Sequence, residues 1–340
     1  MPHPLHLCKV SRIYKKVLII RLSSMGDVVV CSPVVRCVKL QWGCELHFVV
    51  KRQFVDVVRD SPYLDRIHVL DDDQRALHKI LQAEKYDLVI DLHKNMRSRR
   101  ILSALSTAAV TYDKLRWEKW LWINFKINRM PDKHLVDRYF DALAPLGLKN
   151  DQHGLDYFLS QKDRDVASQF LNLHKITSQY DVIVLGAAHK TKRVPLDLAR
   201  QIIQSANRQI IIIGGPAEAS DGASLQEDSR GKAISACGEM SISQSAALIA
   251  NCDHVVTGDT GMMHISAAFK KKIVVVWGST HEDLGMYPYM PFGKMSHYNA
   301  RVPLACNPCT KIGNSKCPKG HFKCMEQQDA KAISQQIADN

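Results

Sequence analysis

An aspartate and two serines follow the first strongly apolar stretch of the sequence. The stretch 16–21 (KVLIIR) is succeeded by Ser23, Ser24 and Asp27. A carboxylate held at the end of a strand could take a proton from a hydroxyl group, and the serines could orient that hydroxyl or contact a phosphate. The alternatives are local, because Asp27 could cap the helix expected over 28–40 and the serines could stabilise a turn.

A second group of polar residues opens another expected helix. Asp259, Thr260 and Gly261 follow the apolar stretch 254–257. Backbone amides at a helix N-terminus attract anions, so Thr260 and Gly261 would offer N–H groups to a diphosphate. His264 lies about one turn further and could approach the same phosphates. Asp259 could equally cap the helix, and a single helical histidine is commonly structural.

Cations and a carboxylate follow two more apolar stretches. Lys190, Lys192 and Arg193 come after the stretch YDVIVLG, and any of them could neutralise a phosphate. Glu218 follows the double glycine at 214–215 and is suited to accept hydrogen bonds from ribose hydroxyls. A solvated or turn position is the alternative interpretation of Glu218.

One long segment is strongly basic. Residues 93–138 contain eleven Lys or Arg and four Asp or Glu. Lys94, Arg97, Arg99 and Arg100 come directly after a strand-like stretch. An acceptor that carries carboxylates or phosphates would meet this charge, so we expect these four residues to bind it. A solvated helix face is the alternative.

The same segment contains aromatic residues interleaved with cations. They are Trp117, Trp120, Trp122 and Phe125, with Lys119 and Lys126 beside them. This mixture is typical of a contact with a membrane interface. Core packing of the tryptophans is equally compatible with the pattern.

Four of the ten cysteines cluster near the C-terminus. They are Cys306, Cys309, Cys317 and Cys324, with His321 among them. Such a set would suit a tetrahedral structural zinc site. A packed cluster of reduced thiols is the alternative, and we expect no catalytic metal or other cofactor.

Strand-like stretches alternate with helix-length segments along the chain, at 16–21, 45–50, 66–70, 86–92, 180–186, 209–215, 254–257 and 272–277. This alternation predicts parallel strands with right-handed crossovers. The sequence therefore predicts the α/β class, with two Rossmann-like, doubly wound parallel-sheet domains that face a cleft. Ligands collect in such a cleft, at the carboxyl ends of the strands.

A polar segment at 160–177 separates the two series of strands, which places the expected domain boundary between 158 and 178. We expect residues 1–160 to form the first domain, residues 175–325 the second, and residues 326–340 a C-terminal helix.

Composition limits the class of protein. The chain has 340 residues, and Lys plus Arg exceed Asp plus Glu by 12, which favours anionic partners. No apolar run approaches the ~20 residues that span a bilayer, and the segment up to Lys16 lacks the features of a signal peptide. We therefore expect a cytoplasmic protein with mostly reduced cysteines. The signatures of dinucleotide dehydrogenases and P-loop ATPases are missing from the sequence.

Four motifs together resemble those of glycosyltransferase family 9, the bacterial lipopolysaccharide heptosyltransferases. They are RLSSMGD at 21–27 with the following Ser32-Pro33, GAAHKTKRVP at 186–195, GGPAE at 214–218 and GDTGMMH at 258–264. Their order and spacing match the family over nearly the whole chain. The resemblance implies a GT-B fold of two Rossmann-like domains. It also implies inverting, metal-independent transfer of heptose from ADP-heptose to the lipopolysaccharide inner core.

The resemblance also implies roles for individual residues. It assigns Asp27 as the base and selects Lys192 as the cation beside the phosphates, and it makes Met240 and Ser241 similar to the segment that contacts the adenine. The first domain would bind the acceptor and the second the nucleotide sugar. Many relatives have hydroxyl residues where this sequence has Ala187 and Ala188, so backbone amides would replace side-chain contacts to phosphate there. A glycolipid acceptor further implies a peripheral contact with the cytoplasmic face of the inner membrane.

Two other functions fit parts of the sequence. A nucleotide-sugar epimerase or hydrolase of the same architecture would turn over the donor with no acceptor present. A zinc-stapled nucleic-acid-binding protein would use the net charge and the cysteine cluster, and its binding would depend on salt. The sequence has no recognisable nucleic-acid-binding motif, so we expect no nucleic-acid partner.

Overall fold

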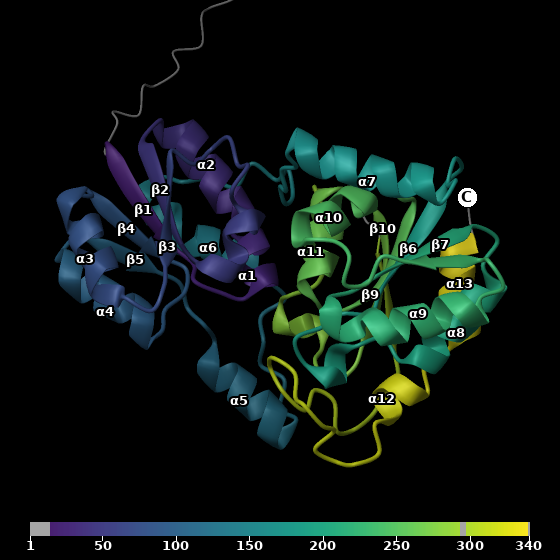
Figure 1. The fold of residues 1–340 in the computed structure, drawn as a ribbon. Helices are drawn as coiled ribbons and strands as arrows, with labels where there is room; N and C mark the ends of the chain where they lie inside the picture. Colours follow the sequence, from purple (N-terminus) through teal and green to yellow (C-terminus); the bar gives the residue numbers. More distant parts are fainter. Residues whose placement is uncertain (1–13, 293–296, 339–340) are drawn as a thin grey trace, which may run out of the picture.

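The computed structural model describes residues 14–292 and 297–338, which form two parallel β-sheets (Figure 1). The first sheet has the order β3-β2-β1-β4-β5. Its strands are β1 (Lys16–Ile20), β2 (Glu45–Lys51), β3 (Arg66–Leu70), β4 (Leu88–Asp91) and β5 (Ala109–Thr111). The central strands are buried on both faces, which explains why they appear in the sequence as unbroken apolar runs.

The second sheet has the order β11-β10-β9-β6-β7-β8. Its strands are β6 (Tyr180–Val184), β7 (Gln209–Ile213), β8 (Ala233–Ser235), β9 (His254–Gly258), β10 (Lys272–Trp277) and β11 (His297–Arg301). Counted from its own first strand, this is the Rossmann order 3-2-1-4-5-6, and the first sheet follows the same order without the last strand. The predicted fold class is confirmed.

Helices cover both sheets (Figure 1). In the first half they are α1 (Met25–Val30), α2 (Ser32–Trp42), α3 (Gln74–Ala83), α4 (Met96–Leu105), α5 (Arg116–Phe125) and α6 (Leu135–Leu143). In the second half they are α7 (Gln161–Leu173), α8 (Leu196–Ser205), α9 (Ala219–Asp228), α10 (Ile242–Asn251), α11 (Gly261–Ala268), α12 (Lys323–Glu326) and α13 (Ala330–Ala338). None of the helices in the described ranges is long and apolar enough to cross a membrane.

The sequence missed three of the four edge strands and misjudged two helical segments. β5 and β8 have three residues each, and β11 (HYNAR) carries mainly polar residues, so none gives a clear apolar signal. The single helix expected over 28–40 consists of α1 and α2, which meet at Cys31. The polar segment at 160–177 contains α7, which packs on α10 of the second sheet.

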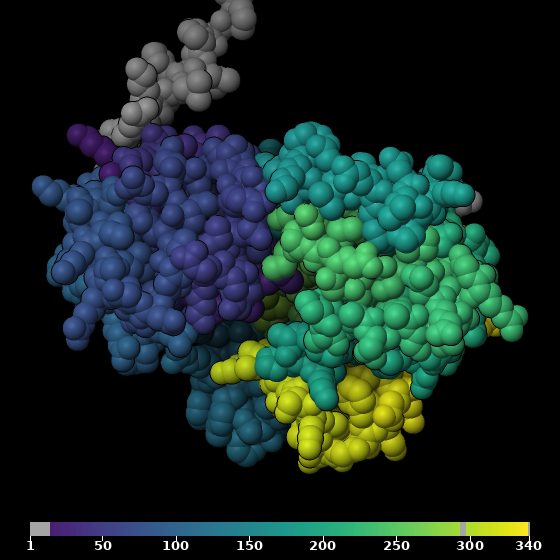
Figure 2. Space-filling model, viewed as in Figure 1, coloured from purple at the N-terminus to yellow at the C-terminus, as the bar shows by residue number. Residues whose placement is uncertain are grey.

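One of the buried apolar clusters spans both halves. Val29 and Val30 of α1 belong to the same buried cluster as Met263 and Ile265 of α11. α1 packs directly against α11 at the junction of the halves. Below this junction, the space-filling view shows a hollow between the N-terminal half, in purple and blue, and the C-terminal half, in green (Figure 2). The shared core therefore fixes how the walls of this hollow face each other.

Candidate active site

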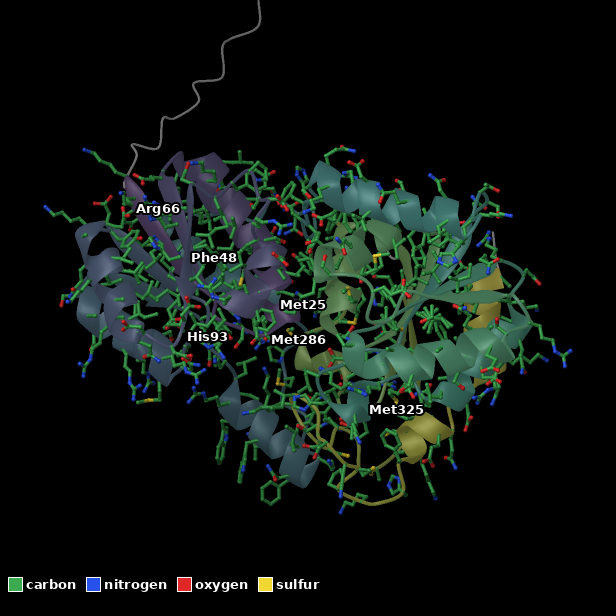
Figure 3. All side chains as sticks on the ribbon, viewed as in Figure 1. Met25, Phe48, Arg66, His93, Met286 and Met325 are labelled. Atoms are coloured by element: carbon green, nitrogen blue, oxygen red, sulfur yellow. The ribbon has the colours of Figure 1, made fainter. Side chains whose placement is uncertain are left out.

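A cavity of about 1090 Å³ lies between the two sheets. Residues that follow β1, β6, β7 and β9 line it, so it occupies the carboxyl ends of the central strands of both sheets. Met25 and Met286 both line its wall, and Figure 3 labels them at the junction of the halves. The volume suits a ligand of the size of a nucleotide sugar.

Asp27 faces this cavity from the first turn of α1. Its carboxylate pairs with the Arg21 guanidinium and accepts hydrogen bonds from the amide and hydroxyl of Ser24, at 3.1 and 2.7 Å. Burial acts to raise the pKa of Asp27, but Arg21 and Ser24 outweigh burial and lower the pKa to about 2. The side chain stays 23% exposed, so an ionised carboxylate is presented to a ligand in the cavity.

The capping role considered for Asp27 is shared with Ser24, because the two residues form the capping box of α1. Ser24 precedes α1, and Asp27 stands three residues later with its carboxylate turned back to the Ser24 amide. Ser24 lines the cavity. The Ser23 carbonyl accepts a hydrogen bond from Arg21 Nε at 3.0 Å and so helps to hold the guanidinium. Arg21, which the sequence analysis did not single out, is the residue that fixes the Asp27 carboxylate.

Two glycines let the halves approach at the site. A Cβ atom on Gly26 would lie 2.7 Å from His264 Cδ2, and one on Gly261 would lie 2.2 Å from Met25 Cε. Only residues without a side chain allow α1 and α11 to pack this closely. Asp27 therefore lies beside the N-terminus of α11, where we expect phosphates to bind.

The N-terminus of α11 differs in detail from the expectation. Thr260 caps the helix, because its Oγ1 accepts a hydrogen bond from the Met263 amide at 3.4 Å. Asp259 instead pairs with Lys192 Nζ at 2.6 Å and accepts a hydrogen bond from Thr280 at 2.8 Å. Asp259, Thr260, Gly261 and Lys192 all line the cavity. The structure thus brings the expected phosphate-binding residues together.

His264 is buried behind this terminus. It is 1% exposed, and burial lowers its pKa to about 4, with the Lys192 charge adding to the effect of burial. Its Nδ1 has no hydrogen-bond partner in the described part of the chain. A neutral imidazole in this position packs against Gly26 at the wall of the cavity.

Glu218 is buried and ion-paired, which excludes the solvated alternative. Its carboxylate pairs with Arg193 at 2.7 Å and accepts a hydrogen bond from the Gly215 amide at 3.0 Å. Glu218 and Met240 line the cavity, as do Ala187 and Ala188. Ser241 is exposed and caps α10. Arg193 therefore pairs with Glu218, whereas the sequence left open whether Arg193 neutralises a phosphate.

The basic residues expected at the acceptor side lie mostly away from the cavity. Arg97, Arg99 and Arg100 are exposed on α4, and Lys94 Nζ donates to the Tyr112 carbonyl at 2.8 Å. None of the four lines the cavity, so their acceptor role stays a prediction. The cations that do line it are Arg21, Lys114, Arg116, Lys119, Lys192 and Lys311. Lys114, Arg116 and Lys119 belong to the same basic segment, but the sequence could not rank its members.

One tryptophan of α5 fits core packing, and the other two fit the expected contact with a membrane. Trp122 is buried, with its ring centroid 5.0 Å from that of His281. Trp117 and Trp120 are 62% and 45% exposed and stack on each other at 4.9 Å. Phe125 is 58% exposed beside Trp120. The helix thus buries one tryptophan and exposes an aromatic strip at the rim of the cavity.

The C-terminal cysteines are neighbours but do not form a closed set of ligands. Cys306 Sγ lies 3.6 Å from His321 Nε2, and Cys324 is buried. In the described ranges, the groups with at least three potential ligand atoms within 4.8 Å of one another lie elsewhere, and one of them is His47, His68 and Glu84. Structural zinc at the cysteines stays a prediction.

The fold and the cavity together define a class of protein. Two Rossmann-ordered sheets enclose a cleft, with a carboxylate on one wall and a helix N-terminus with a lysine on the other. This is the architecture of GT-B glycosyltransferases.

Comparison with known proteins places the chain within that class. Residues 74–318 match the model of glycosyltransferase family 9 (heptosyltransferase), so the chain belongs to this family. It is 26% identical over 297 residues to lipopolysaccharide heptosyltransferase 1 of Escherichia coli K12, covering 79% of this chain and 89% of that protein. It is 28% identical over 338 residues to lipooligosaccharide heptosyltransferase 2 of Campylobacter jejuni serotype O:6, covering 92% and 95%.

Solved structures show the same fold. The family 9 glycosyltransferase of Veillonella parvula superposes with a TM-score of 0.79 at 20% identity, covering 95% of this chain and 96% of that one. The E. coli heptosyltransferase WaaC with ADP superposes with a TM-score of 0.66 at 22% identity, covering 95% and 99%. The resemblance inferred from the sequence motifs is confirmed.

Proposed function

We propose that this protein is an inverting heptosyltransferase that moves heptose from ADP-heptose to an acceptor of the lipopolysaccharide inner core. The observation that carries the proposal is the position of Asp27, which the close packing of Gly26 and Gly261 sets beside the N-terminus of α11. A base and an anion site on opposite walls of one cleft are what transfer from a nucleotide sugar needs. Family membership and the named activity of the relatives support the choice of heptose.

In the proposed reaction, an acceptor hydroxyl attacks the anomeric carbon of the donor. Its proton passes to the Asp27 carboxylate, the new glycosidic bond forms on the face opposite the phosphate, and the bond from the anomeric carbon to the phosphate oxygen breaks. The configuration at that carbon is thereby inverted. ADP leaves with the bonding electron pair.

The donor half would stabilise the charge that develops on ADP. Lys192 and the amides at the start of α11 surround the place where the diphosphate would lie, so these residues compensate its charge without a catalytic metal. Glu218 would accept hydrogen bonds from the ribose hydroxyls, and Met240 would contact the adenine. Asp259, which now pairs with Lys192, would hold this lysine in place as the diphosphate binds.

The two halves would divide the substrates. Residues 1–160 would bind the acceptor and residues 175–325 the nucleotide sugar, with 326–340 closing the second half. α13 supports this division, since Ile333 and Ile337 pack into the core of the second sheet. Arrival of the acceptor would complete a site from which water is excluded.

The exposed strip on α5 would contact the cytoplasmic face of the inner membrane. Trp117, Trp120 and Phe125 are exposed, and the cations Lys126 and Arg129 are exposed near them. Aromatic rings with adjacent cations suit the interface of an anionic bilayer. Replacing Trp117 and Trp120 by Ser should reduce sedimentation with vesicles of anionic phospholipid. Leu173→Ser, at an apolar side chain of α7 that is 77% exposed, is the control that should not.

A nucleotide panel followed by a transfer assay tests the proposed function. A nucleotide at ~100 times its Kd raises the stability by ~2.7 kcal/mol. ADP should therefore raise the melting temperature more than UDP, GDP, dTDP or CMP. With ADP-heptose, ADP release should require the inner-core acceptor. Turnover of the donor without acceptor would instead identify an epimerase or hydrolase, and equal stabilisation by all nucleotides would reject the ADP-sugar donor.

A further inference from the structure

The turn that carries Lys192 is enclosed by glycines from three separate segments. A Cβ atom on Gly258, at the end of β9, would lie 2.0 Å from the Lys192 carbonyl oxygen. A Cβ atom on Gly278, directly after β10, would lie 2.3 Å from the Thr191 carbonyl oxygen, and one on Gly313 would lie 2.8 Å from Lys192 Cδ. Each of these approaches requires a residue without a side chain, so the backbone around Lys192 is packed tightly on three sides.

Thr191 lies inside this enclosure and is 1% exposed. Its hydroxyl donates a hydrogen bond to the Asn314 carbonyl at 3.1 Å and accepts hydrogen bonds from the Asn314 amide at 2.8 Å and the Ser279 hydroxyl at 2.7 Å. The Thr191 amide donates to the Asn314 carbonyl at 3.2 Å, and its carbonyl accepts from the Ser279 amide at 3.3 Å. Thr191 is therefore bound through both its side chain and its backbone to two residues that are distant in the sequence.

Asn314 ends a loop, residues 306–314, that contacts both halves of the protein and lines the cavity. At the start of this loop, Lys126 Nζ donates hydrogen bonds to the carbonyls of Cys306 and Pro308, at 2.9 and 2.7 Å. Lys126 directly follows α5, and the loop, in yellow, lies beside that helix (Figure 1). The loop is thus anchored on the first half at one end and on the turn before Lys192 at the other.

The Lys192 side chain is ordered by these surroundings. A lysine on a surface samples many rotamers, and fixing it when a ligand binds costs conformational entropy. Here the stem packs against Gly313, the ammonium group pairs with Asp259 at 2.6 Å, and the side chain is only 16% exposed. The entropy has therefore been lost before a ligand arrives, which strengthens a contact to a phosphate.

We propose that Thr191 is a positioning residue for Lys192 and that it acts through the loop 306–314. The hydrogen bonds of Thr191 anchor the end of the loop, and the loop fixes the lysine stem through Gly313. Lys192 is thereby kept in the place where it compensates the charge of the diphosphate. This inference rests on the proposed function, because it explains how the phosphate-binding lysine of that function is held.

A double-mutant cycle with Lys192→Ala tests the positioning role. The Kd of ADP is measured by calorimetry for Thr191→Val, both in the wild-type protein and in Lys192→Ala. Val keeps the shape of the side chain but lacks the hydroxyl, so ADP should bind about fivefold more weakly in the wild-type background. In Lys192→Ala the same substitution should change the Kd by less than about twofold, because residues that act as one unit are not additive. Thr191→Ser keeps the hydroxyl and should restore most of the affinity.

Gly313→Ala is a second variant, and the chain offers a matched control for it. A methyl group at Gly313 would displace the stem of Lys192, so ADP should bind about fivefold more weakly. Gly231 also has a positive φ, 86° against 104° at Gly313, but a Cβ atom there would meet nothing within 4 Å in the described part of the chain. Gly231→Ala should therefore introduce similar backbone strain and leave the Kd of ADP unchanged.

The outcomes separate the positioning role from the proposed function. Equal weakening by Thr191→Val in both backgrounds would mean that Thr191 acts on the fold or on other residues of the loop, and it would overturn the inference. Wild-type affinity in Gly313→Ala would overturn it as well. If the coupling between Thr191 and Lys192 is observed but the wild-type protein transfers no heptose, the positioning role is supported and the proposed function is rejected.

Discussion

Replacement of Asp27 by Asn is the most direct test of the proposed chemistry. Asn keeps the size of the side chain and an oxygen that can accept the Ser24 hydrogen bonds, but it cannot take a proton. Loss of a positioned general base lowers a rate by about 10²–10⁴-fold. This range corresponds to roughly 2.7–5.4 kcal/mol in the activation free energy. We therefore expect kcat to fall by at least 10²-fold, with the ADP thermal shift unchanged.

The surroundings of Asp27 make Asn a better replacement than Ala for this test. Arg21 is 5% exposed, and removing its carboxylate partner leaves a buried charge, which can cost about 3–5 kcal/mol of stability. Other partners of Arg21 remain, namely the Ser23 and Leu92 carbonyls and the Tyr139 hydroxyl at 3.1 Å. These partners remain in both variants, but only Asn keeps an oxygen that accepts the Ser24 hydrogen bonds, so Asp27→Asn should lose less stability than Asp27→Ala.

The assay measures initial rates of ADP release at saturating donor and acceptor. Asp141→Asn is the matched control, because Asp141 is an exposed carboxylate paired with Lys133 at 2.8 Å, and its loss should cost little. If Asp27→Asn keeps more than a tenth of the wild-type rate, Asp27 is not the general base. The Asp27–Arg21 ion pair would then have a structural role.

The low pKa of Asp27 gives a pH dependence with a definite sign. The folded pKa of about 2 lies below the usual value of ~3.9, so the stability contributed by the pair is fully present above about pH 4. It is lost as pH falls through 2. Between pH 5 and 9 the carboxylate stays ionised, and the rate should show no titration of this group.

Two further predictions concern contacts at the cleft. Gly26→Ala would place a Cβ atom 2.7 Å from His264 Cδ2 and separate α1 from α11. Transfer should therefore slow roughly 10²-fold while ADP binding persists. A wild-type rate would show that the close packing of α1 on α11 is not needed for transfer. Lys192→Ala should weaken ADP binding about tenfold in a calorimetric titration, and unchanged affinity would remove this lysine from the phosphate site.

Much of the fold could be predicted because the central strands are buried on both faces. Such strands appear as unbroken apolar runs, and the loops after them carry the motifs that contain Asp27, Lys192 and Thr260. The edge strands β5, β8 and β11 could not be found, since they are short or polar. Similarly, α7 was hidden by its largely polar sequence, and its place became visible only through its packing on α10.

The sequence by itself determined the class of fold and the family, and it predicted which loops line the cavity. These three features follow from local sequence patterns, namely an apolar strand, a polar loop and a helix that recur along the chain. Only the tertiary structure decided which cations line the cavity. Arg97 and Lys119 are equivalent in a count of charges, yet Arg97 is exposed on α4 and Lys119 lines the cavity. Whether a charge has a partner depends on which distant segments the sheets bring together, and composition and periodicity do not encode that pairing.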